Sequence, residues 1–142
     1  MGKLSFKPVI RKFQEKDFTS IEKFDEDFKL VLKECKKIGW IYVAVVNEII
    51  GYIAIIIGQE SAYFDDDIMN WAEICELHVK PHFQNQGVGT LLTKFAIKEA
   101  YNKGFSRIYV STDDFNKPAR HIYEKCGFKE FNRIIRYKYE LT

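Results

Sequence analysis

The sequence has few cysteines and no long apolar run, and each scarcity excludes a class of protein. Its three cysteines, Cys35, Cys75 and Cys126, are odd in number, widely spaced and never in a C-x-x-C pair, so neither a disulfide framework nor a zinc site is expected. The apolar stretch 49–57 is interrupted by a glycine and is far shorter than the roughly 20 residues of a membrane-spanning helix. Residues 1–7 lack the apolar core of a signal peptide. We therefore expect a cytoplasmic protein without a membrane partner.

The chain also lacks an excess of either charge. Its 142 residues include 22 basic and 20 acidic ones, so the formal net charge is +2. A dedicated nucleic-acid-binding domain presents a strongly basic face, and this balance argues against such a partner. The 12 Phe, 8 Tyr and 2 Trp are too many aromatic residues for a disordered chain. Both the length and the absence of a linker-like segment predict a single domain over residues 1–142.

The spacing of apolar residues predicts an α/β domain. β-Branched runs indicate strands, and apolar residues three or four apart indicate helices. The central strand–helix–strand unit requires a right-handed parallel crossover. The predicted order is strand 7–13, helix 17–37 in two pieces, hairpin strands 41–46 and 49–57, strand 71–79, helix 87–104, strand 107–112, helix 116–127 and one or two strands within 128–141.

The most informative stretch is ELHVKPHFQNQGVGTLL, residues 76–92. A strand ends at Val79, and QNQGVG then leads into a helix N-terminus, whose unpaired N–H groups and positive dipole end suit a phosphate. Gly87 and Gly89 lack the Cβ atoms that would hold an anion away from the backbone. No Walker lysine follows Gly89, and a dinucleotide fingerprint needs a third glycine where Leu92 stands, so neither nucleotide motif is present. The pattern that remains is L-x-V-x-P followed by Q-x-x-G-x-G.

A second motif lies downstream, where residues 116–128 read NKPARHIYEKCGF and fit N-x-x-A-x-x-x-Y-x-x-x-G-F. A G-x-G alone is most often an ordinary turn, but two motifs in this order are specific. Together they resemble the two acetyl-CoA segments of the GCN5-related N-acetyltransferase (GNAT) family. With the hairpin and the first helices, the resemblance covers nearly the whole chain. It implies a mixed, mostly antiparallel sheet with a central parallel strand–helix–strand unit and helices on both faces.

The resemblance implies an N-acetyltransferase that moves an acetyl group from acetyl-CoA to a primary amine by direct attack in a ternary complex. The amine belongs to a small molecule or a protein, no metal is implied, and a homodimer is one expectation because terminal strands in this family often join dimers. A non-catalytic acyl-CoA-binding module is the alternative function. The residues implied in cofactor binding are Leu77, His78 and Val79 of the strand, Gln84, Asn85, Gln86, Gly87, Val88, Gly89 and Thr90 of the loop and helix start, and Asn116, Ala119 and Tyr123 of the second segment.

Acetyl transfer to an amine needs a base and benefits from an acid. The amine is mostly ammonium at neutral pH, so a proton must leave before the nitrogen attacks. Tyr123 matches the acid of the family, although its helical stripe also suits a core aromatic. Glu73 in A-E-I matches the glutamate of histone-acetylating members and, in a regular strand, shares a face with Leu77 and Val79. A bulge would mix the faces, so Glu76 is the second choice, and a strand glutamate is otherwise a solvated or ion-paired residue.

Three further features have weaker interpretations. Members that acetylate ribosomal protein N-termini carry a glutamate where this chain has Ser111, which argues against that substrate. The three loop acids, residues 65–67, have two interpretations: they belong to a solvated turn, or they attract a cationic amine to the site. His78 and His82 are four residues apart, but Pro81 between them prevents a helical zinc pair.

Overall fold

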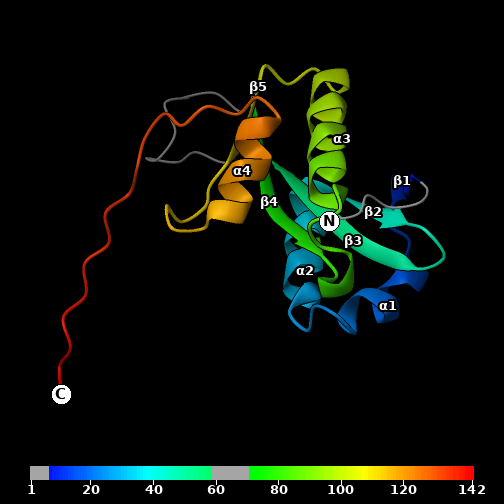
Figure 1. The fold of residues 1–142 in the computed structure, drawn as a ribbon, viewed down its shortest axis with the longest axis horizontal. Helices are drawn as coiled ribbons and strands as arrows, with labels where there is room; N and C mark the ends of the chain where they lie inside the picture. Colours follow the sequence, from blue (N-terminus) through cyan, green and yellow to red (C-terminus); the bar gives the residue numbers. More distant parts are fainter. Residues whose placement is uncertain (1–6, 59–70) are drawn as a thin grey trace.

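The sheet of the protein is mixed, as predicted. A computed structural model of the chain describes residues 7–58 and 71–142. Five strands of this described part form one sheet in the order β1-β2-β3-β4-β5, in which β1 to β4 are antiparallel and β5 is parallel to β4 (Figure 1). The strands are β1 (Val9–Lys12), β2 (Gly39–Val45), β3 (Ile49–Ile57), β4 (Trp71–Val79) and β5 (Arg107–Val110).

Helices cover both faces of this sheet, which confirms the predicted fold class (Figure 1). The predicted helix over 17–37 is indeed broken into α1 (Phe18–Glu22) and α2 (Phe28–Ile38), and both pack on one face. On the other face, α3 (Val88–Asn102) buries a stripe of small and apolar side chains four residues apart. The stripe consists of Val88, Leu92, Ala96 and Ala100. Beside α3 and β5 lies α4 (Lys117–Lys125), and single 3-10 turns occur at Glu15–Asp17 and Pro81–Phe83.

One irregularity interrupts the pairing of β3 with β4. The register pairs Ala54 with Glu76 but Ile55 with Ile74, so Cys75 is an extra residue in β4. This arrangement is a β-bulge, in which two residues of one strand oppose one residue of the other. Past the bulge, the alternation of side chains between the two faces is reversed relative to a regular strand.

The bulge corrects the prediction that Glu73 shares a face with Leu77 and Val79. Glu73 and Glu76 both pair with β3 residues whose side chains belong to the core beneath α1 and α2. Leu77 and Val79 instead pack against the core beneath α3. The two glutamates therefore lie on the same face, and strand parity does not distinguish between them.

The terminal segment differs from its prediction. Residues 128–141 were expected to hold one or two strands, yet they form none, so this prediction is wrong. After Gly127 the chain leaves the body in an extended path (Figure 1). An alternating sequence becomes a strand only when a neighbouring strand takes its backbone hydrogen bonds, and the period of the side chains does not supply that neighbour. In the described residues, no helix is long and apolar enough to cross a membrane.

The N-terminal strand is fastened to α1 by a buried carboxylate. Arg11 donates two hydrogen bonds to Asp17, at 2.8 and 2.9 Å, and the Gln14 N–H donates a third at 2.7 Å. Asp17 is only 4% exposed. The hydrogen bonds from the Arg11 guanidinium hold the pKa of Asp17 below its ordinary value. Burial alone would raise that pKa, so the ion pair outweighs desolvation.

We predict that Asp17→Asn lowers the free energy of unfolding by about 2 kcal/mol at pH 7, the usual effect of losing hydrogen bonds to a charged group. The pKa of Asp17 is lower in the folded state than in the unfolded state. The extra stability of the native protein over the variant is therefore present above the ordinary Asp pKa of about 3.9, and it disappears as the pH falls through the pKa of the folded state. Urea unfolding at neutral and acid pH measures it. Asp27→Asn, at an exposed position, is the control, and equal losses in the two variants would contradict the assignment.

Candidate functional site

The candidate site lies where β4 and β5 part. Their parallel pairing joins Trp71–Ile74 to Arg107–Val110, and beyond Ile74 the described register of β4 continues only with β3. In the described register, the second half of β4, residues 75–79, thus has an unpaired edge on its β5 side, which we call the opening of β4, and α4 lies on that side (Figure 1). The bulge at Cys75 stands at the beginning of this opening. This half of β4 contains the strand residues predicted to bind the cofactor.

The predicted phosphate loop leads directly from β4 to α3. Gly87 is the N-cap of α3 with φ at +88°, and a Cβ added there would meet nothing within 4 Å. The loop is held by two side-chain amides, because Gln84 donates to the Val79 carbonyl at 2.9 Å and Gln86 donates to the His82 carbonyl at 3.1 Å. The first N–H groups of a helix have no intrahelical acceptor. At Gly87 the start of the helix is uncovered by side chains, which fits a phosphate.

Gly89, the other glycine of the motif, is required by packing. It is buried, and a Cβ there would lie 2.9 Å from the end of the Ile122 side chain in α4. The side chains of Leu77 and Val79 would follow at 3.8 Å. The missing side chain therefore lets the first turn of α3 approach both α4 and β4. Gly87, rather than Gly89, is the glycine that leaves open space at the helix start.

The second motif forms α4, and two of its residues have visible structural tasks. The Asn116 side chain accepts a hydrogen bond from the Ala119 N–H at 3.2 Å, so the predicted N-cap is confirmed. Tyr123 packs edge-on against Phe128, with ring centroids 5.8 Å apart. Burial, and after it the negative charge of Glu76, raises the pKa of Tyr123 to about 12. The phenol therefore keeps its proton at neutral pH, and the charge of the Glu76 carboxylate on β4 contributes to this.

The two β4 glutamates differ in their surroundings. Burial alone raises the pKa of Glu73. Burial also raises the pKa of Glu76, the charge of Asp25 raises it further, and His78 lowers it. A base with a raised pKa binds the amine proton more strongly. Both glutamates meet this condition, but the charge of Glu76 acts on Tyr123 as well.

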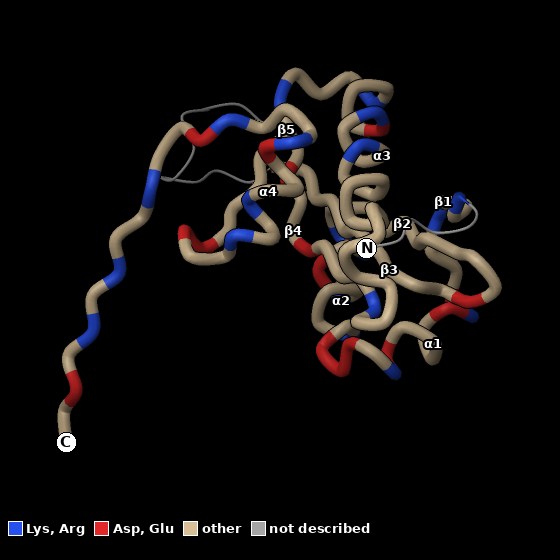
Figure 2. Tube along the Cα trace, viewed as in Figure 1, with Lys and Arg blue, Asp and Glu red and all other residues tan. Residues whose placement is uncertain are grey.

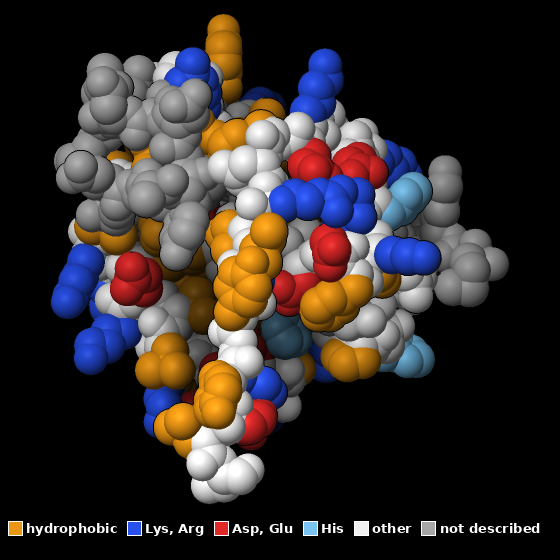
Figure 3. Space-filling model, turned by 90° about the vertical axis from the view of Figure 1, so that its left-hand side faces the viewer, with side chains coloured by type: hydrophobic (Ala, Val, Ile, Leu, Met, Phe, Trp, Pro, Cys, Tyr) orange, Lys and Arg blue, Asp and Glu red, His pale blue; other side chains and the backbone are white. Residues whose placement is uncertain are grey.

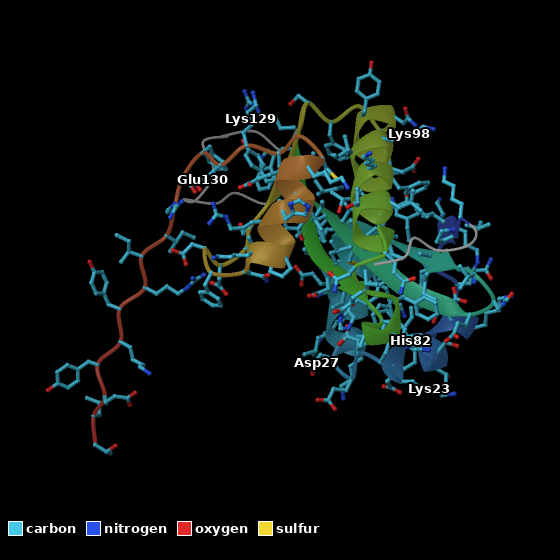
Figure 4. The ribbon with its side chains drawn as sticks, viewed as in Figure 1. Lys23, Asp27, His82, Lys98, Lys129 and Glu130 are labelled. Atoms are coloured by element: carbon cyan, nitrogen blue, oxygen red, sulfur yellow. The ribbon has the colours of Figure 1, made fainter. Side chains whose placement is uncertain are left out.

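A small network from the turn between α1 and α2 supports this face. The Tyr52 hydroxyl donates a hydrogen bond to Asp25, and the His78 Nδ1 lies 3.6 Å from the same carboxylate. The rings of Tyr52 and His78 are stacked with centroids 5.9 Å apart, and Phe24 contacts His78 at 5.5 Å. Acidic residues gather at this turn and on β4 (Figure 2). Lys23 and Asp27 of the turn and His82 after β4 are found at the same end of the molecule (Figure 4).

Sequence reasoning missed Asp25 and Tyr52. Asp25 falls in the break between two helical pieces, and Tyr52 is one residue of an apolar run, so neither stands in a motif. Only the pairing of Tyr52 with His78 across β3 and β4 brings them to the site. The predicted loop acids, residues 65–67, lie outside the described residues. Within the described residues, no group of three His, Cys, Asp or Glu side chains is arranged to hold a metal ion.

Cys75, which forms the bulge, is poorly suited to be a nucleophile. Its thiol is hydrogen-bonded with that of Cys35, and this bond together with burial raises its pKa. It also donates to the Ala54 carbonyl at 3.5 Å. The thiolate is the reactive form of a cysteine, so a thiol held protonated does not attack an acyl group readily.

A groove of about 930 Å³ lies beside β5 and α4, and its volume is in the range of ligand sites. Its walls come from β5 and the loop after it, from α4, and from the C-terminal segment. Tyr123 lines it, together with Val110, Ser111 and Thr112. The tyrosine therefore lines this groove and is also within range of the charge of Glu76 on β4. A molecule held in the groove would lie beside the phenol.

Comparison with known proteins agrees with this geometry. The sequence model of the Acetyltransferase (GNAT) family matches residues 7–128. N-alpha-acetyltransferase 30 of Schizosaccharomyces pombe is 31% identical over 64 residues, 45% of this chain and 43% of that protein. Thialysine N-epsilon-acetyltransferase of Mus musculus is 33% identical over 55 residues, 39% of this chain and 32% of that protein. The matches therefore span less than half the length of these relatives.

Solved structures share the fold at low sequence identity. An aminoglycoside N-acetyltransferase in complex with CoA superposes with a TM-score of 0.76 and 18% identity, covering 93% of this chain and 99% of that one. An acetyltransferase of Bacillus subtilis in complex with CoA superposes with a TM-score of 0.70 and 23% sequence identity. The match covers 87% of this chain and 77% of that one. The match of the family model over residues 7–128, on a sheet that opens between β4 and β5, shows that the chain belongs to the GNAT acetyltransferase family.

Proposed function

We propose that the protein is an acetyl-CoA-dependent N-acetyltransferase that acetylates a primary amine by direct attack in a ternary complex. The observation that carries the proposal is that the charge of Glu76, on the second half of β4, acts on Tyr123 of α4, so that a carboxylate and a phenol with raised pKa values lie within electrostatic range of each other. A non-catalytic acyl-CoA-binding module would not need this pair. The three cysteines are free thiols, which fits the predicted cytoplasmic location.

The acetyl donor is proposed to lie along the opening of β4. The backbone of residues 77–79 would pair with the pantetheine arm as an added strand does, and the first turn of α3 would hold the pyrophosphate. The open space at Gly87 supports this placement. The side chains of Gln84 and Gln86 are hydrogen-bonded to β4 and to the turn after it. These bonds would preorganise the loop for binding the donor.

For the base we propose Glu76, the second choice from the sequence, ahead of Glu73. The parity argument for Glu73 does not survive the bulge, since the two glutamates share a face. Glu76 also lies past the point where β4 and β5 separate, and its charge acts on Tyr123. The Glu76 carboxylate would take the proton from the ammonium, directly or through a water. The free amine would then attack the thioester carbonyl.

For the acid we propose Tyr123. Its hydroxyl is protonated at neutral pH because its pKa is raised to about 12. When the tetrahedral intermediate collapses, the C–S bond breaks and the thiolate of CoA needs a proton. The phenol would supply it and recover a proton from solvent, so the enzyme ends each cycle unchanged.

The acceptor is proposed to be a cationic amine. Glu76 and Asp25 act on each other electrostatically, and together they would attract an ammonium group. The relatives named above act on amino groups of different molecules, which leaves the acceptor itself to experiment. Release of CoA thiol, followed with acetyl-CoA and a panel of aminoglycosides, diamines, lysine analogues and N-terminal peptides, tests the activity. Tight binding of CoA with no thiol release from any amine would favour the binding module.

We predict that Gly87→Ala weakens binding of CoA on the order of tenfold, equivalent to about 1.4 kcal/mol, because a Cβ would occupy the space at the helix start. Gly104→Ala is a matched control. Gly104 follows the other end of α3 with a φ of +90° and equally open surroundings, so both variants should lose about 1 kcal/mol of stability to backbone strain. Calorimetric titration with CoA compares them. Equal affinities in the two folded variants would contradict the phosphate site.

Tyr123→Phe should lower turnover on the order of 100-fold while CoA affinity stays nearly intact, since the ring and its contact with Phe128 remain and only the proton donor is lost. Steady-state rates with one accepted amine, with CoA titration beside them, give the measurement. If the Tyr123→Phe enzyme is as active as the native one, Tyr123 is not the acid and has only a packing role.

We further predict that Glu76→Gln lowers the rate and removes the acidic limb of the pH–rate profile. A base acts only when deprotonated, so the native rate should fall as the pH drops through a pKa above the ordinary Glu value of about 4.3. Glu73→Gln, on the same face, is the control and should keep the limb. If the limb vanishes in the Glu73 variant alone, the base is Glu73.

A further inference from the structure

Two thiols meet behind the site and have no part in the proposed transfer. Cys35 stands in the last turn of α2, is 4% exposed and belongs to the core beneath α1 and α2. Cys75, the extra residue of the β4 bulge, packs against the same core. The two thiols are hydrogen-bonded to each other, and neither is in a disulfide. The fold thus brings together two oxidisable groups that are far apart in the sequence.

The packing of α2 on the sheet fixes this meeting. The Cys75 thiol reaches the Ala54 carbonyl at 3.5 Å. Ala54 is paired with Ile41 across β3 and β2, and Ile41 lines a small pocket together with Cys35. Both strands are the ones on which α2 packs. The two sulfurs are therefore held between a helix and the sheet, and their contact does not depend on a loose surface chain.

The small pocket gives a solute a way to Cys35. It has a volume of about 250 Å³, and its walls come from α2, from β1 with the turn after it, and from the beginning of β2. A site for one water needs only roughly 10–15 Å³ of such volume. A hydroperoxide is little larger than water, so it fits this pocket beside the Cys35 side chain.

The two thiols are unequal, and the inequality gives each a different task. The hydrogen bond from Cys75 lowers the pKa of Cys35, although burial opposes the change. The pKa of Cys75 is raised, first by its hydrogen bond with Cys35 and then by burial. The thiolate is the form of a cysteine that attacks an oxidant. Cys35 is therefore the thiol that reacts first, and Cys75 is the one that follows.

We propose that Cys35 and Cys75 are an oxidisable pair, which a hydroperoxide converts into a disulfide that ties the bulge of β4 to α2. In the first step the Cys35 thiolate attacks the terminal oxygen of the hydroperoxide. The O–O bond breaks, and Cys35 becomes a sulfenic acid. The alkoxide or hydroxide that leaves takes the proton that Cys35 has given up.

In the second step the Cys75 sulfur attacks the sulfenic sulfur of Cys35. The S–S bond forms, the S–O bond breaks, and hydroxide leaves with the Cys75 proton as water. The two thiols lose two electrons, and the hydroperoxide gains them. The raised pKa of Cys75 does not block this step, because its largest cause is the hydrogen bond with the Cys35 thiol, which the first step consumes.

The disulfide would act on the proposed base through the bulge. Cys75 directly precedes Glu76, and the charges of Glu73 and Glu76 act on its thiol. Oxidation would take the Cys75 sulfur from the Ala54 carbonyl and move the residue that sets the position of Glu76. We expect acetyl transfer to slow on the order of tenfold or more, since a small displacement of a catalytic group is costly. This effect rests on the proposed function, whereas formation of the disulfide does not.

The third cysteine, Cys126, provides the matched control. It lines the groove beside β5 together with the C-terminal segment, whose hydrophobic side chains follow the face of the molecule that Figure 3 presents. Its thiol points to the Thr90 carbonyl at 3.8 Å. No other cysteine of the described residues lines that groove. Cys126 is thus a free thiol of the same chain that lies outside the pair.

The test is the intact mass of the full chain after mild treatment with hydrogen peroxide, followed by peptide mapping without reduction. The native protein and Cys126→Ser should each lose two hydrogen atoms, about 2 Da, in a bond between the peptides of Cys35 and Cys75, and dithiothreitol should restore the mass. Cys35→Ala and Cys75→Ala, with CoA binding as a check of the fold, should form no internal bond. A native protein that only gains oxygen, or a bond that includes Cys126, would overturn the pair.

The rate of CoA thiol release, measured on purified protein before oxidation, after it and after dithiothreitol, tests the effect on the site. The rate should fall with the disulfide and recover with its reduction, and Cys75→Ala should not respond. An active enzyme whose rate is unchanged by a complete disulfide would overturn the link to Glu76. If the reduced protein acetylates no amine, the proposed function fails, and the mass measurement still decides whether the pair exists.

Discussion

The arrangement of the site depends on one extra residue in a strand. If β4 paired regularly, with no bulge at Cys75, Glu73 and Glu76 would lie three positions apart in the alternation and would face opposite sides of the sheet. The bulge places both on the side of α1 and α2, while Leu77 and Val79 stay in the core beneath α3. It also stands where β4 leaves β5. One residue thus combines an open backbone edge with a carboxylate beside it, which is what transfer of an acyl group to an amine needs.

The rest of the fold holds this junction in place. Small residues in α3 let the helix lie close to the sheet, and Gly89 lets its first turn reach α4. The turn between α1 and α2 supplies Asp25, whose carboxylate takes a hydrogen bond from Tyr52 and lies near His78. The proposed donor side and the proposed acceptor side are therefore built by different helices. Because both sides meet at β4, a change in the register of this strand would disturb the two together.

Much of the fold follows from local pattern. The break between α1 and α2, the hairpin of β2 and β3, and the Asn116 cap were all predicted from spacing and turn residues. The bulge was not, because an extra residue in β4 becomes visible only against β3. The roles of Asp25 and Tyr52 were not predicted for the same reason, because their hydrogen bond joins residues that are far apart in the sequence. The terminal segment has a strand pattern and no strand, which shows that periodicity specifies a preference but not a partner.

The most direct test of the account is the titration of the two glutamate side chains by carboxyl ¹³C NMR, in the native protein and in Asp25→Asn. The account places Glu76, past the bulge, within the field of Asp25, and Glu73 outside it. Both pKa values should lie above the ordinary glutamate value. Replacing Asp25 should lower the pKa of Glu76 and leave that of Glu73 raised. If Glu76 titrates at the ordinary value, or if the change falls on Glu73, the bulge does not arrange the site as described.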